Sequence, residues 1–339
     1  MATIKEVAKL ADVSPSTVSN VFTGRVPVRE KTRRRVLAAA QTLGYVPNYV
    51  ARGLRRQETH LVAFSIGDIA NPSQSSTVRG ASDVLLDHGY HPLIFSCDER
   101  PDQEAEILEI ARQQRVAGML LAPVSQDRRT YERLHDLSIK FVCVDRHIKG
   151  LDADVVRSDD VFGFCQATQH LLDQGHKRLA IITGPQGSAV SSERMRGFKE
   201  ALISCDIQVA PELILEGTSN ERFGYDSLVR LINLERPPTG IVTTSTRLTL
   251  GVLYAMRDYG IKRPEQMALV GSVGRDLEWM SLFTPPLTYV AQPSREMGRE
   301  AAKLLIARMS GERNGPGEEF LIKPELIVHY PQPAPDSTD

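Results

Sequence analysis

Short apolar runs alternate with longer amphipathic segments from Leu61 onward, and no other feature of the sequence limits the possible folds as strongly. The apolar runs read LVAFSI, HPLIFS, GMLLAP, KFVCVD, RLAIIT, LILEG, GIVTTS, MALVGS and LTYVAQ. Segments with helical periodicity accompany them at about 74–88, 102–115, 127–137, 162–174, 191–204, 222–233, 246–259 and 293–309. Strands that alternate with helices predict parallel sheets with helices on both faces.

The number of crossovers in this pattern is too large for one small sheet, so we expect a two-lobed α/β body. Open parallel sheets bind ligands beyond the carboxyl ends of their strands. Two such sheets facing each other predict a cleft for a small molecule between the lobes.

The charges are distributed unevenly between the two parts of the chain. Residues 1–60 contain 11 Lys and Arg and 4 Asp and Glu, a net charge of +7, whereas the remainder contains 30 basic and 38 acidic residues, a net charge of −8. A basic N-terminal part on an acidic body indicates that only the first part meets a polyanion. Charge alone leaves open the alternative of a solvated basic face without a partner.

The first residues carry the start signals of two short helices. Thr3 precedes an apolar periodic segment and has Glu6 three residues later, the pattern of a capping box. Ser14 followed by Pro15 reads as an N-cap with proline at the first helical position, so we expect a second helix from about Pro15 to Phe22.

A third helix is predicted from about Glu30 to Leu43, ended by Gly44. Its expected core residues are Val36, Leu37, Ala40 and Leu43. Three short helices around one small core, with the turn after the first, form a helix-turn-helix. The third helix supplies outward charge from Lys31, Arg33, Arg34 and Arg35, and the pattern therefore favours binding to DNA.

The segments TIKEVAKLADVSPSTVSNVFTG and VREKTRRRVLAAAQTLGYVPNYVARGLRR resemble the DNA-binding head of the lactose-repressor (LacI/GalR) family. The resemblance implies that Pro15, Ser16 and Asn20 contact base edges in the major groove. It also implies a hinge helix after Pro47 in which Leu54, with Arg55, enters the minor groove and bends the duplex. The phosphate contacts implied by the resemblance are Thr3, Ser14, Thr17, Ser19, Tyr45 and Arg52.

Residues 61–330 resemble the effector domain of the same family, which is itself similar to periplasmic sugar-binding proteins. The expected fold is therefore an all-α helix-turn-helix head plus a two-lobed α/β, periplasmic-binding-protein-like effector domain with parallel sheets. The expected divisions are a head at 1–46, a hinge at 47–59, an effector-binding and dimerisation domain at 60–330 and a disordered tail at 331–339. The tail PQPAPDSTD has no heptads, which favours a dimer over a tetramer.

The effector contacts carried over by resemblance or by position combine hydroxyl groups with charged groups. They are Ser73, Arg146, Asp159, Arg194, Ser219, Thr246, Arg247, Arg275 and Asp276. For Arg194 and Asp159, a structural ion pair that lines the cleft is the alternative.

Relatives often have Asn-Asp or Ser-Asp where this chain reads Ser245-Thr246-Arg247, and Gly-Phe-Asp-Asp where it reads GSVGRDLEW. The loss of carboxylates and the gain of Arg247 and Arg275 shift the expected cleft toward positive potential. The expected effector is a sugar, a sugar phosphate or a sugar acid, and the arginines favour the anionic classes.

The sequence therefore predicts a cytoplasmic transcription regulator, most often a repressor in such a family, that binds a palindromic operator as a homodimer. Whether the effector releases or secures DNA stays open. We expect neither cofactor nor metal, because the residues show no nucleophile–base pair and no metal-spaced cluster. Cys97, Cys143, Cys165 and Cys205 are interpreted as reduced core residues. The competing classes are a transport-associated sugar-binding protein and a sugar-converting enzyme.

Overall fold

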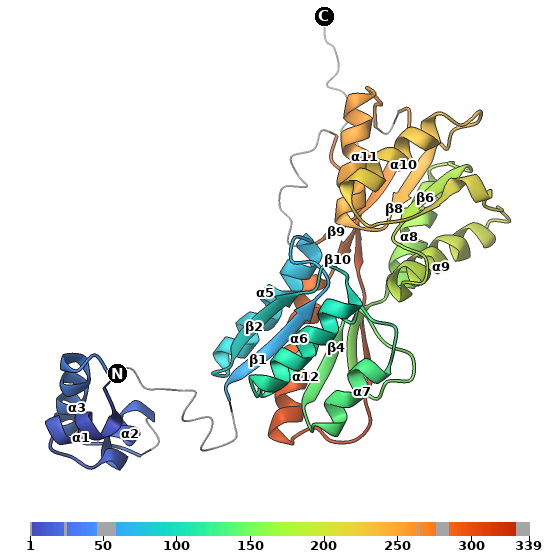
Figure 1. Cartoon of the computed structure of the whole chain (residues 1–339). Coiled ribbons are helices and arrows are strands. Elements are labelled where there is room, and N and C mark those ends of the chain that lie inside the picture. The colour runs from blue at the N-terminus through green and yellow to red at the C-terminus, as the bar shows by residue number, and fades with distance from the viewer. Residues whose placement is uncertain (1, 24–25, 46–58, 264, 276–284, 330–339) are drawn as a thin grey trace, which may run out of the picture. The chain divides into compact units, whose positions relative to one another are not determined.

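The computed structural model describes residues 2–23, 26–45, 59–263, 265–275 and 285–329. The chain forms two compact units, Met1–Thr59 and His60–Asp339 (Figure 1). Most of the predicted hinge and the whole predicted tail lie outside the described residues.

In the described part of the first unit, three helices surround a small apolar core. They are α1 (Ile4–Leu10), α2 (Pro15–Thr23) and α3 (Glu30–Thr42). Their buried core residues are Val7, Ala8, Ala11, Val18, Val36, Ala39 and Ala40. These helices agree with the predicted ones to within one residue at most ends.

Two of the predicted core residues in α3 are wrong. The side chains of Leu37 and Leu43 are 41% and 36% exposed, whereas Ala39 is buried. Successive residues of a helix are separated by about 100°, so Val36, Ala39 and Ala40 share the inward face and Leu37 points away from it. Leu43 follows the last helical residue as the C-cap, ahead of Gly44 at φ +58°.

Lobe 1 of the second unit is built on a six-stranded parallel sheet. Its strands, in spatial order, are β11 (Glu319–Ile322), β5 (Asp154–Ser158), β4 (Lys140–Val144), β3 (Gly118–Leu121), β1 (Leu61–Ile66) and β2 (His91–Ser96). Helices α5 (Pro72–Asp87) and α12 (Ser294–Ser310) pack on one face. Helices α6 (Pro101–Gln113) and α7 (Arg129–Asp136) pack on the other.

Lobe 2 repeats this architecture with one antiparallel edge strand. Its spatial order is β12 (Glu325–Ile327), β10 (Thr288–Gln292), β9 (Ala268–Gly274), β8 (Gly240–Thr243), β6 (Leu179–Thr183) and β7 (Ile214–Glu216), with β12 antiparallel to β10. Helices α8 (Asp160–Asp173) and α9 (Ala189–Ile203) cover one face, and α10 (Glu221–Ile232) and α11 (Thr246–Asp258) cover the other. A short 3₁₀ helix, Pro211–Leu213, precedes β7.

The chain crosses between the lobes three times, from β5 to α8, from β10 to α12 and from β11 to β12. The two-lobed fold predicted from the alternation is confirmed, but strands β5, β11 and β12 were not among the predicted runs. Their sequences DVVRS, EFLI and ELI are short, and each carries charged or half-exposed residues. A continuous apolar run is therefore missing at the segments next to the crossovers.

Glycine lets the paired helices of each lobe approach closely. A Cβ atom added at Gly298 of α12 would lie 1.9 Å from the carbonyl oxygen of Thr77 in α5, and one at Gly80 would lie 2.0 Å from the carbonyl oxygen of Arg295. Backbone at that distance cannot be displaced cheaply, so these positions require glycine. The α8–α9 and α10–α11 contacts have the same feature, at Gly197 and Gly251.

The four cysteines are free, and Cys97 and Cys143 are buried as expected. Burial raises the pKa of the Cys97 thiol to about 11. Cys205 is exposed just beyond the end of α9, so its interpretation as a core residue is wrong. No helix in the described ranges combines the length and apolar character that crossing a bilayer requires.

Candidate functional sites

The N-terminus of α2 carries a group of hydroxyls. Ser14 Oγ accepts a hydrogen bond from the Thr17 backbone N–H at 3.1 Å, and it lies 2.7 Å from Ser16 Oγ and 2.8 Å from Thr17 Oγ1. Pro15 occupies the first helical position, where its missing N–H costs nothing. Free backbone N–H groups and hydroxyls at a helix N-terminus suit an anion such as a phosphate.

The predicted base contacts lie on this same helix. Pro15 and Ser16 are exposed, and Asn20 is partly buried one turn after Ser16. Residues four apart share a helix face, so the Ser16 and Asn20 side chains are presented on one side of α2. The partly buried Ser19 also lies on this helix. The contacts with bases and phosphates stay predictions.

Two other predicted phosphate contacts have structural partners. Thr3 forms the expected capping box, because Glu6 N donates to Thr3 Oγ1 at 3.4 Å and Thr3 N donates to the Glu6 carboxylate at 2.6 Å. This backbone hydrogen bond lowers the pKa of Glu6. The Tyr45 ring packs against Phe22 with 5.9 Å between ring centroids. The predicted contacts Arg52, Leu54 and Arg55 lie outside the described residues.

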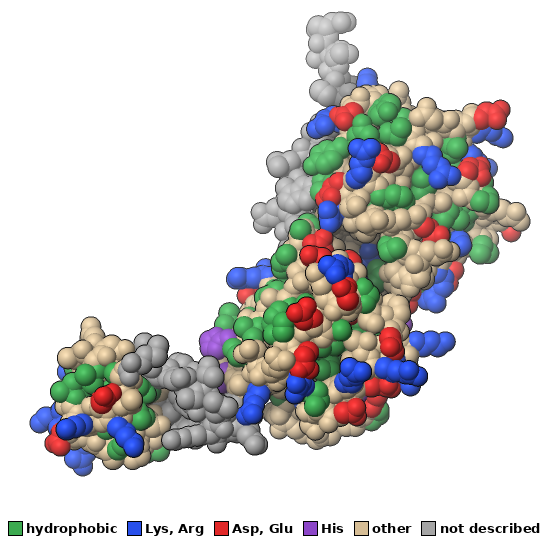
Figure 2. Space-filling model, in the orientation of Figure 1, with side chains coloured by type: hydrophobic (Ala, Val, Ile, Leu, Met, Phe, Trp, Pro, Cys, Tyr) green, Lys and Arg blue, Asp and Glu red, His purple; other side chains and the backbone are tan. Residues whose placement is uncertain are grey.

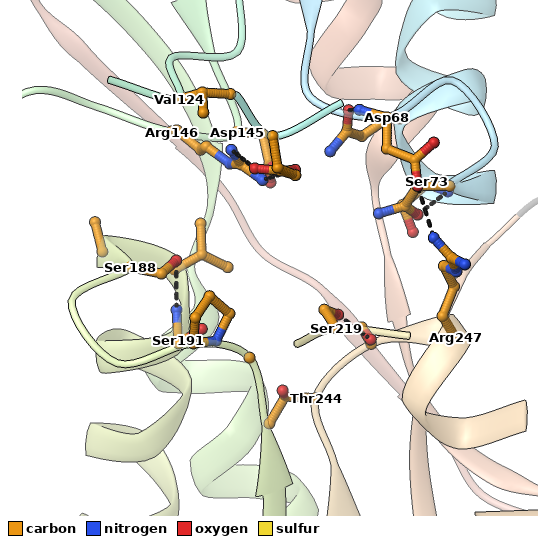
Figure 3. Close-up of a pocket in the computed structure, with 18 of the residues that line it drawn as sticks. Asp68, Ser73, Val124, Asp145, Arg146, Ser188, Ser191, Ser219, Thr244 and Arg247 are labelled. Carbon is orange, nitrogen blue, oxygen red and sulfur yellow. Dashed lines mark hydrogen bonds and ion pairs between the residues drawn. The ribbon is translucent and has the colours of Figure 1, made fainter. Parts of the chain in front are cut away.

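A polar cavity of about 860 Å³ lies between the two lobes, and the space-filling view shows a hollow at this place (Figure 2). Its walls come from loops that follow the carboxyl ends of strands in both sheets, as expected for parallel sheets. Most of the charged lining side chains come from lobe 1, and most of the lining hydroxyls come from lobe 2 (Figure 3). The labelled residues in Figure 3 are Asp68, Ser73, Val124, Asp145, Arg146, Ser188, Ser191, Ser219, Thr244 and Arg247.

The structure brings five of the nine predicted effector contacts into the described cavity lining. They are Ser73, Arg146, Arg194, Ser219 and Arg247.

Three other predicted residues do not line the cavity. Asp159 is the N-cap of α8 and accepts from Phe162 N at 3.2 Å. Thr246 is 2% exposed at the first position of α11. Arg275 forms an ion pair with Glu325 of β12 at 3.3 Å. The ninth residue, Asp276, lies outside the described residues.

The lobe 1 wall contains a bidentate ion pair. Arg146 donates to both oxygens of Glu99, at 2.7 Å each. Burial would raise the pKa of Glu99, but the hydrogen bonds from Arg146 outweigh burial and hold that pKa below its ordinary value. Asp145, beside Arg146, adopts the left-handed region at φ +66°, which few non-glycine residues do. Such backbone strain clusters at ligand sites.

Arg194, at the cavity floor, is held within lobe 2. Its Nε lies 3.1 Å from the Asp160 carboxylate, its Nη1 donates to the carbonyl of Thr244, and its guanidinium lies 5.4 Å from the centroid of the Phe164 ring. Burial raises the pKa of Asp160, and the Arg194 charge only partly offsets that effect. Arg194 therefore forms an ion pair at the cleft, with Asp160 and not with Asp159. Its contact with an effector stays a prediction.

Arg247 contacts two carboxylates from different parts of the chain. Its Nη1 donates to Asp68 of lobe 1 at 2.7 Å, while Nε and Nη2 donate to Glu221 of α10 at 2.9–3.1 Å. Each arginine of the described cavity lining therefore has a carboxylate partner. The positive potential expected from Arg247 is neutralised locally.

Sequence reasoning missed several lining residues, including Asp68, Asp98, Asp145 and Ser245. Each follows closely after the end of a strand, namely β1, β2, β4 and β8. The rule that ligands bind at the carboxyl ends of parallel strands would have singled these positions out. Among the described residues, no group of His, Cys, Asp and Glu has the arrangement of a metal site.

Comparisons with known proteins agree with both parts of this architecture. Residues 3–48 match the model of bacterial regulatory proteins of the lacI family, and residues 168–329 match a periplasmic binding protein-like domain. The HTH-type transcriptional repressor CytR of Escherichia coli K12 is 32% identical over 96% of this chain and 95% of its own length. The ribose operon repressor of the same strain is 30% identical over 91% and 94%, respectively.

Solved structures share the fold over nearly the whole chain. A CelR–cellobiose complex of a transcriptional regulator has 29% identity and a TM-score of 0.73, covering 97% of this chain and 99% of that one. The Lac repressor dimer bound to operator and the anti-inducer ONPF has 23% identity and a TM-score of 0.85, covering 96% and 98%. At that lower identity the likeness concerns the fold alone.

Proposed function

Because the chain belongs to the LacI family of bacterial regulatory proteins, we propose that it represses genes by binding a palindromic operator as a homodimer under control of a small polar effector. It is a transcriptional repressor of this family and a DNA-binding regulator rather than an enzyme. The observation that carries the proposal is the pairing of a hydroxyl-rich helix N-terminus in the first unit with a polar inter-lobe cavity in the second. Since its target is chromosomal DNA, the protein would act in the cytoplasm.

In this proposal Ser16 and Asn20 read base edges with Pro15 in apolar contact, and Leu54 with Arg55 opens a base step in the minor groove. Ser14, Thr17 and Ser19 hold phosphates. A pool of palindromic DNA selected at two salt concentrations tests it, because phosphate contacts make affinity fall steeply with salt. Retention without preference for any palindrome would contradict operator recognition.

Single substitutions then separate the roles on the selected operator. We expect Ser16→Ala and Asn20→Ala each to weaken binding by about 1–3 kcal/mol and to relax preference at one base pair. Leu54→Asn should reduce both affinity and DNA bending, measured by gel mobility of permuted fragments. Thr42→Ala, which removes a hydroxyl bonded only to Ala38 O among the described contacts, is the control and should leave both unchanged.

Dimerisation through the second unit is supported by apolar side chains on its surface. Leu86 at the end of α5 is 52% exposed, and Ile94 is 39% exposed on β2, the edge strand of the lobe 1 sheet. Tyr254 and Tyr259 at α11 are 45% and 52% exposed. An exposed apolar edge strand favours pairing with a second copy. Sedimentation equilibrium should give twice the mass of 37.6 kDa, and a monomer at micromolar concentration would refute the dimer.

For the effector, the structure favours the uncharged class among the three predicted from the sequence. An anion would compete with Glu99, Asp160 or Asp68 for an arginine that is already paired. Hydroxyls of Ser188, Ser219 and their neighbours suit the hydroxyl groups of a neutral sugar. We therefore propose a neutral sugar in place of the expected sugar phosphate or sugar acid.

Calorimetric titration of the full chain with neutral sugars, their phosphates and their acids tests this choice. We expect heat only from a neutral sugar, and Arg194→Gln should abolish it because the guanidinium lies at the cavity floor. Tight binding of a phosphorylated sugar alone would overturn the choice without affecting DNA recognition.

A further inference from the structure

One ion pair joins the two lobes across the cavity. Asp68 follows β1 in lobe 1, whereas Arg247 lies in the first turn of α11 in lobe 2, and their charged atoms are 2.7 Å apart (Figure 3). Together with Glu221, the first residue of α10, they form what we call the inter-lobe clasp.

Asp68 and Arg247 are each oriented by hydrogen bonds within their own lobe. Asp68 Oδ1 accepts from Ala70 N at 2.8 Å, and Asp68 N donates to Gln74 Oε1 at 2.8 Å, so its carboxylate is oriented by its own loop. The hydrogen bonds that Arg247 donates to the Glu221 carboxylate orient its guanidinium and raise its pKa. A preoriented pair loses little side-chain entropy when it forms, unlike most surface ion pairs.

The clasp is partly buried, with side-chain exposures of 24% for Asp68, 27% for Arg247 and 38% for Glu221. Screening by water is therefore weaker than for an exposed pair, and the attraction retains part of its strength. Asp68 and Arg247 also line the cavity, so their contact closes one side of it.

A second inter-lobe ion pair provides an internal comparison. Arg157 of β5 contacts Glu193 of α9, and it also contacts Glu319 within lobe 1. Arg157 lies three residues before Asp160, where the chain itself crosses into lobe 2. Covalent connection keeps the lobes together at that side whether or not the pair forms. Asp68 lies about 90 residues before the first crossover and Arg247 lies more than 40 residues before the second, so neither residue is next to a crossover in sequence and their contact joins the lobes noncovalently.

We propose that the inter-lobe clasp holds the two lobes closed over the cavity when no effector is bound. Loss of the Asp68–Arg247 contact opens that side of the cavity. The closed arrangement is then a property of this chain and not a consequence of the ligand, and an effector binds to lobes that are already held together. The inference concerns the lobes alone and does not depend on the proposed operator or effector.

The test measures the distance between the lobes in the ligand-free full chain. Gln126 in lobe 1 and Gln186 in lobe 2 are exposed on opposite walls of the cavity. Each is replaced by Cys for nitroxide labels, in a Cys205→Ser background that removes the exposed native thiol, with labelled chains diluted into unlabelled ones. Pulsed dipolar spectroscopy then gives the spin–spin distance distribution.

We expect one narrow distribution for the otherwise unchanged protein and a second, longer population for Arg247→Gln and for Asp68→Asn. The double variant should resemble either single variant, because both changes break the same contact. Salt at about 1 M should reproduce the longer population only where the clasp is intact.

Glu132→Gln, which breaks an exposed pair with Arg128 within lobe 1, is the matched control and should leave the distribution unchanged. Glu221→Gln keeps the Asp68 contact and should produce less of the longer population than Arg247→Gln. An unaltered distribution in both Arg247→Gln and Asp68→Asn would overturn the proposal.

Discussion

Each lobe contains a buried carboxylate beside arginines, but the two carboxylates have different surroundings. In lobe 1, Asp154 accepts from Arg308 at 2.7 and 2.9 Å, from Arg313 at 3.1 and 3.3 Å, and from the backbone N–H of Glu318 at 2.9 Å. In lobe 2, Asp160 has Arg194 at 3.1 Å and the side-chain amide of Gln292 at 3.1 Å.

The number of donors decides which protonation state each site favours. Burial would raise the pKa of both carboxyl groups, because the charged form loses its hydration. For Asp154 the hydrogen bonds from Arg308 and Arg313 outweigh burial, and its pKa is lowered. For Asp160 burial dominates, and its pKa is raised. Asp154 is thus a charged anchor for β5, α12 and the segment before β11, whereas Asp160 is a weakly held partner of the cavity-lining Arg194.

The largest expected effect comes from neutralising the anchor. Asp154→Asn removes the carboxylate that the partly buried Arg308 and Arg313 share and leaves Arg313 with Glu318 alone, so the free energy of unfolding should fall by about 3–5 kcal/mol. Chemical denaturation followed by circular dichroism measures the change. A loss below about 1 kcal/mol would show that the arginines find other partners, and the contrast between the lobes would disappear.

Neutralising the Asp160 carboxylate should cost less. Asp160→Asn removes a charge that burial already disfavours, so we expect the free energy of unfolding to fall by only about 1–2 kcal/mol. The same denaturation assay compares the two variants directly. Equal losses for Asp154→Asn and Asp160→Asn would contradict the assignment of different protonation tendencies.

The pH dependence of stability should differ in sign between the two sites. A lowered folded-state pKa means that Asp154 stabilises the fold above its ordinary value near 3.9 and that this stability is lost as pH falls through the folded pKa. A raised folded-state pKa means that the contribution of Asp160 grows as pH falls through that pKa toward the ordinary value. Denaturation midpoints measured between about pH 2 and 7 should therefore fall less steeply on acidification in Asp154→Asn and more steeply in Asp160→Asn.

The smallest effect is expected at an exposed pair, which serves as the reference. Arg128 and Glu132 are 2.8 Å apart, with side-chain exposures of 52% and 43%. Glu132→Gln should reduce the free energy of unfolding by at most about 0.5 kcal/mol, because water screens the pair. A loss comparable to that of Asp160→Asn would mean that burial does not distinguish these sites.

The helices of the first unit were predictable because their signals are local. The capping box of Thr3 and Glu6 and the cap at Ser14 each involve residues three apart, and the structure shows both. Whether a leucine side chain points into the core or toward solvent was less predictable, as Leu37 shows. An inward position and an outward position can be adjacent in the sequence of a helix.

The cavity was less predictable because its charges are neutralised by distant residues. Arg247 meets Asp68, 179 residues away in sequence, and this contact neutralises the charge from which a positive potential was expected. Asp159 and Asp160 are adjacent, yet helix geometry makes the first a cap and turns the second toward Arg194. Apolar runs revealed the central strands, whereas strands beside the crossovers are short and partly polar.

The glycine contacts between paired helices have a mechanical consequence. At Gly298 and Gly80 the backbones of α12 and α5 are in contact, so α12 cannot slide along α5 without steric overlap. We therefore expect these two helices of lobe 1 to move together. The same lobe contains the start of β1 at Leu61, where the chain from the first unit enters. A small rotation of lobe 1 would therefore displace the point at which the chain from the first unit is attached.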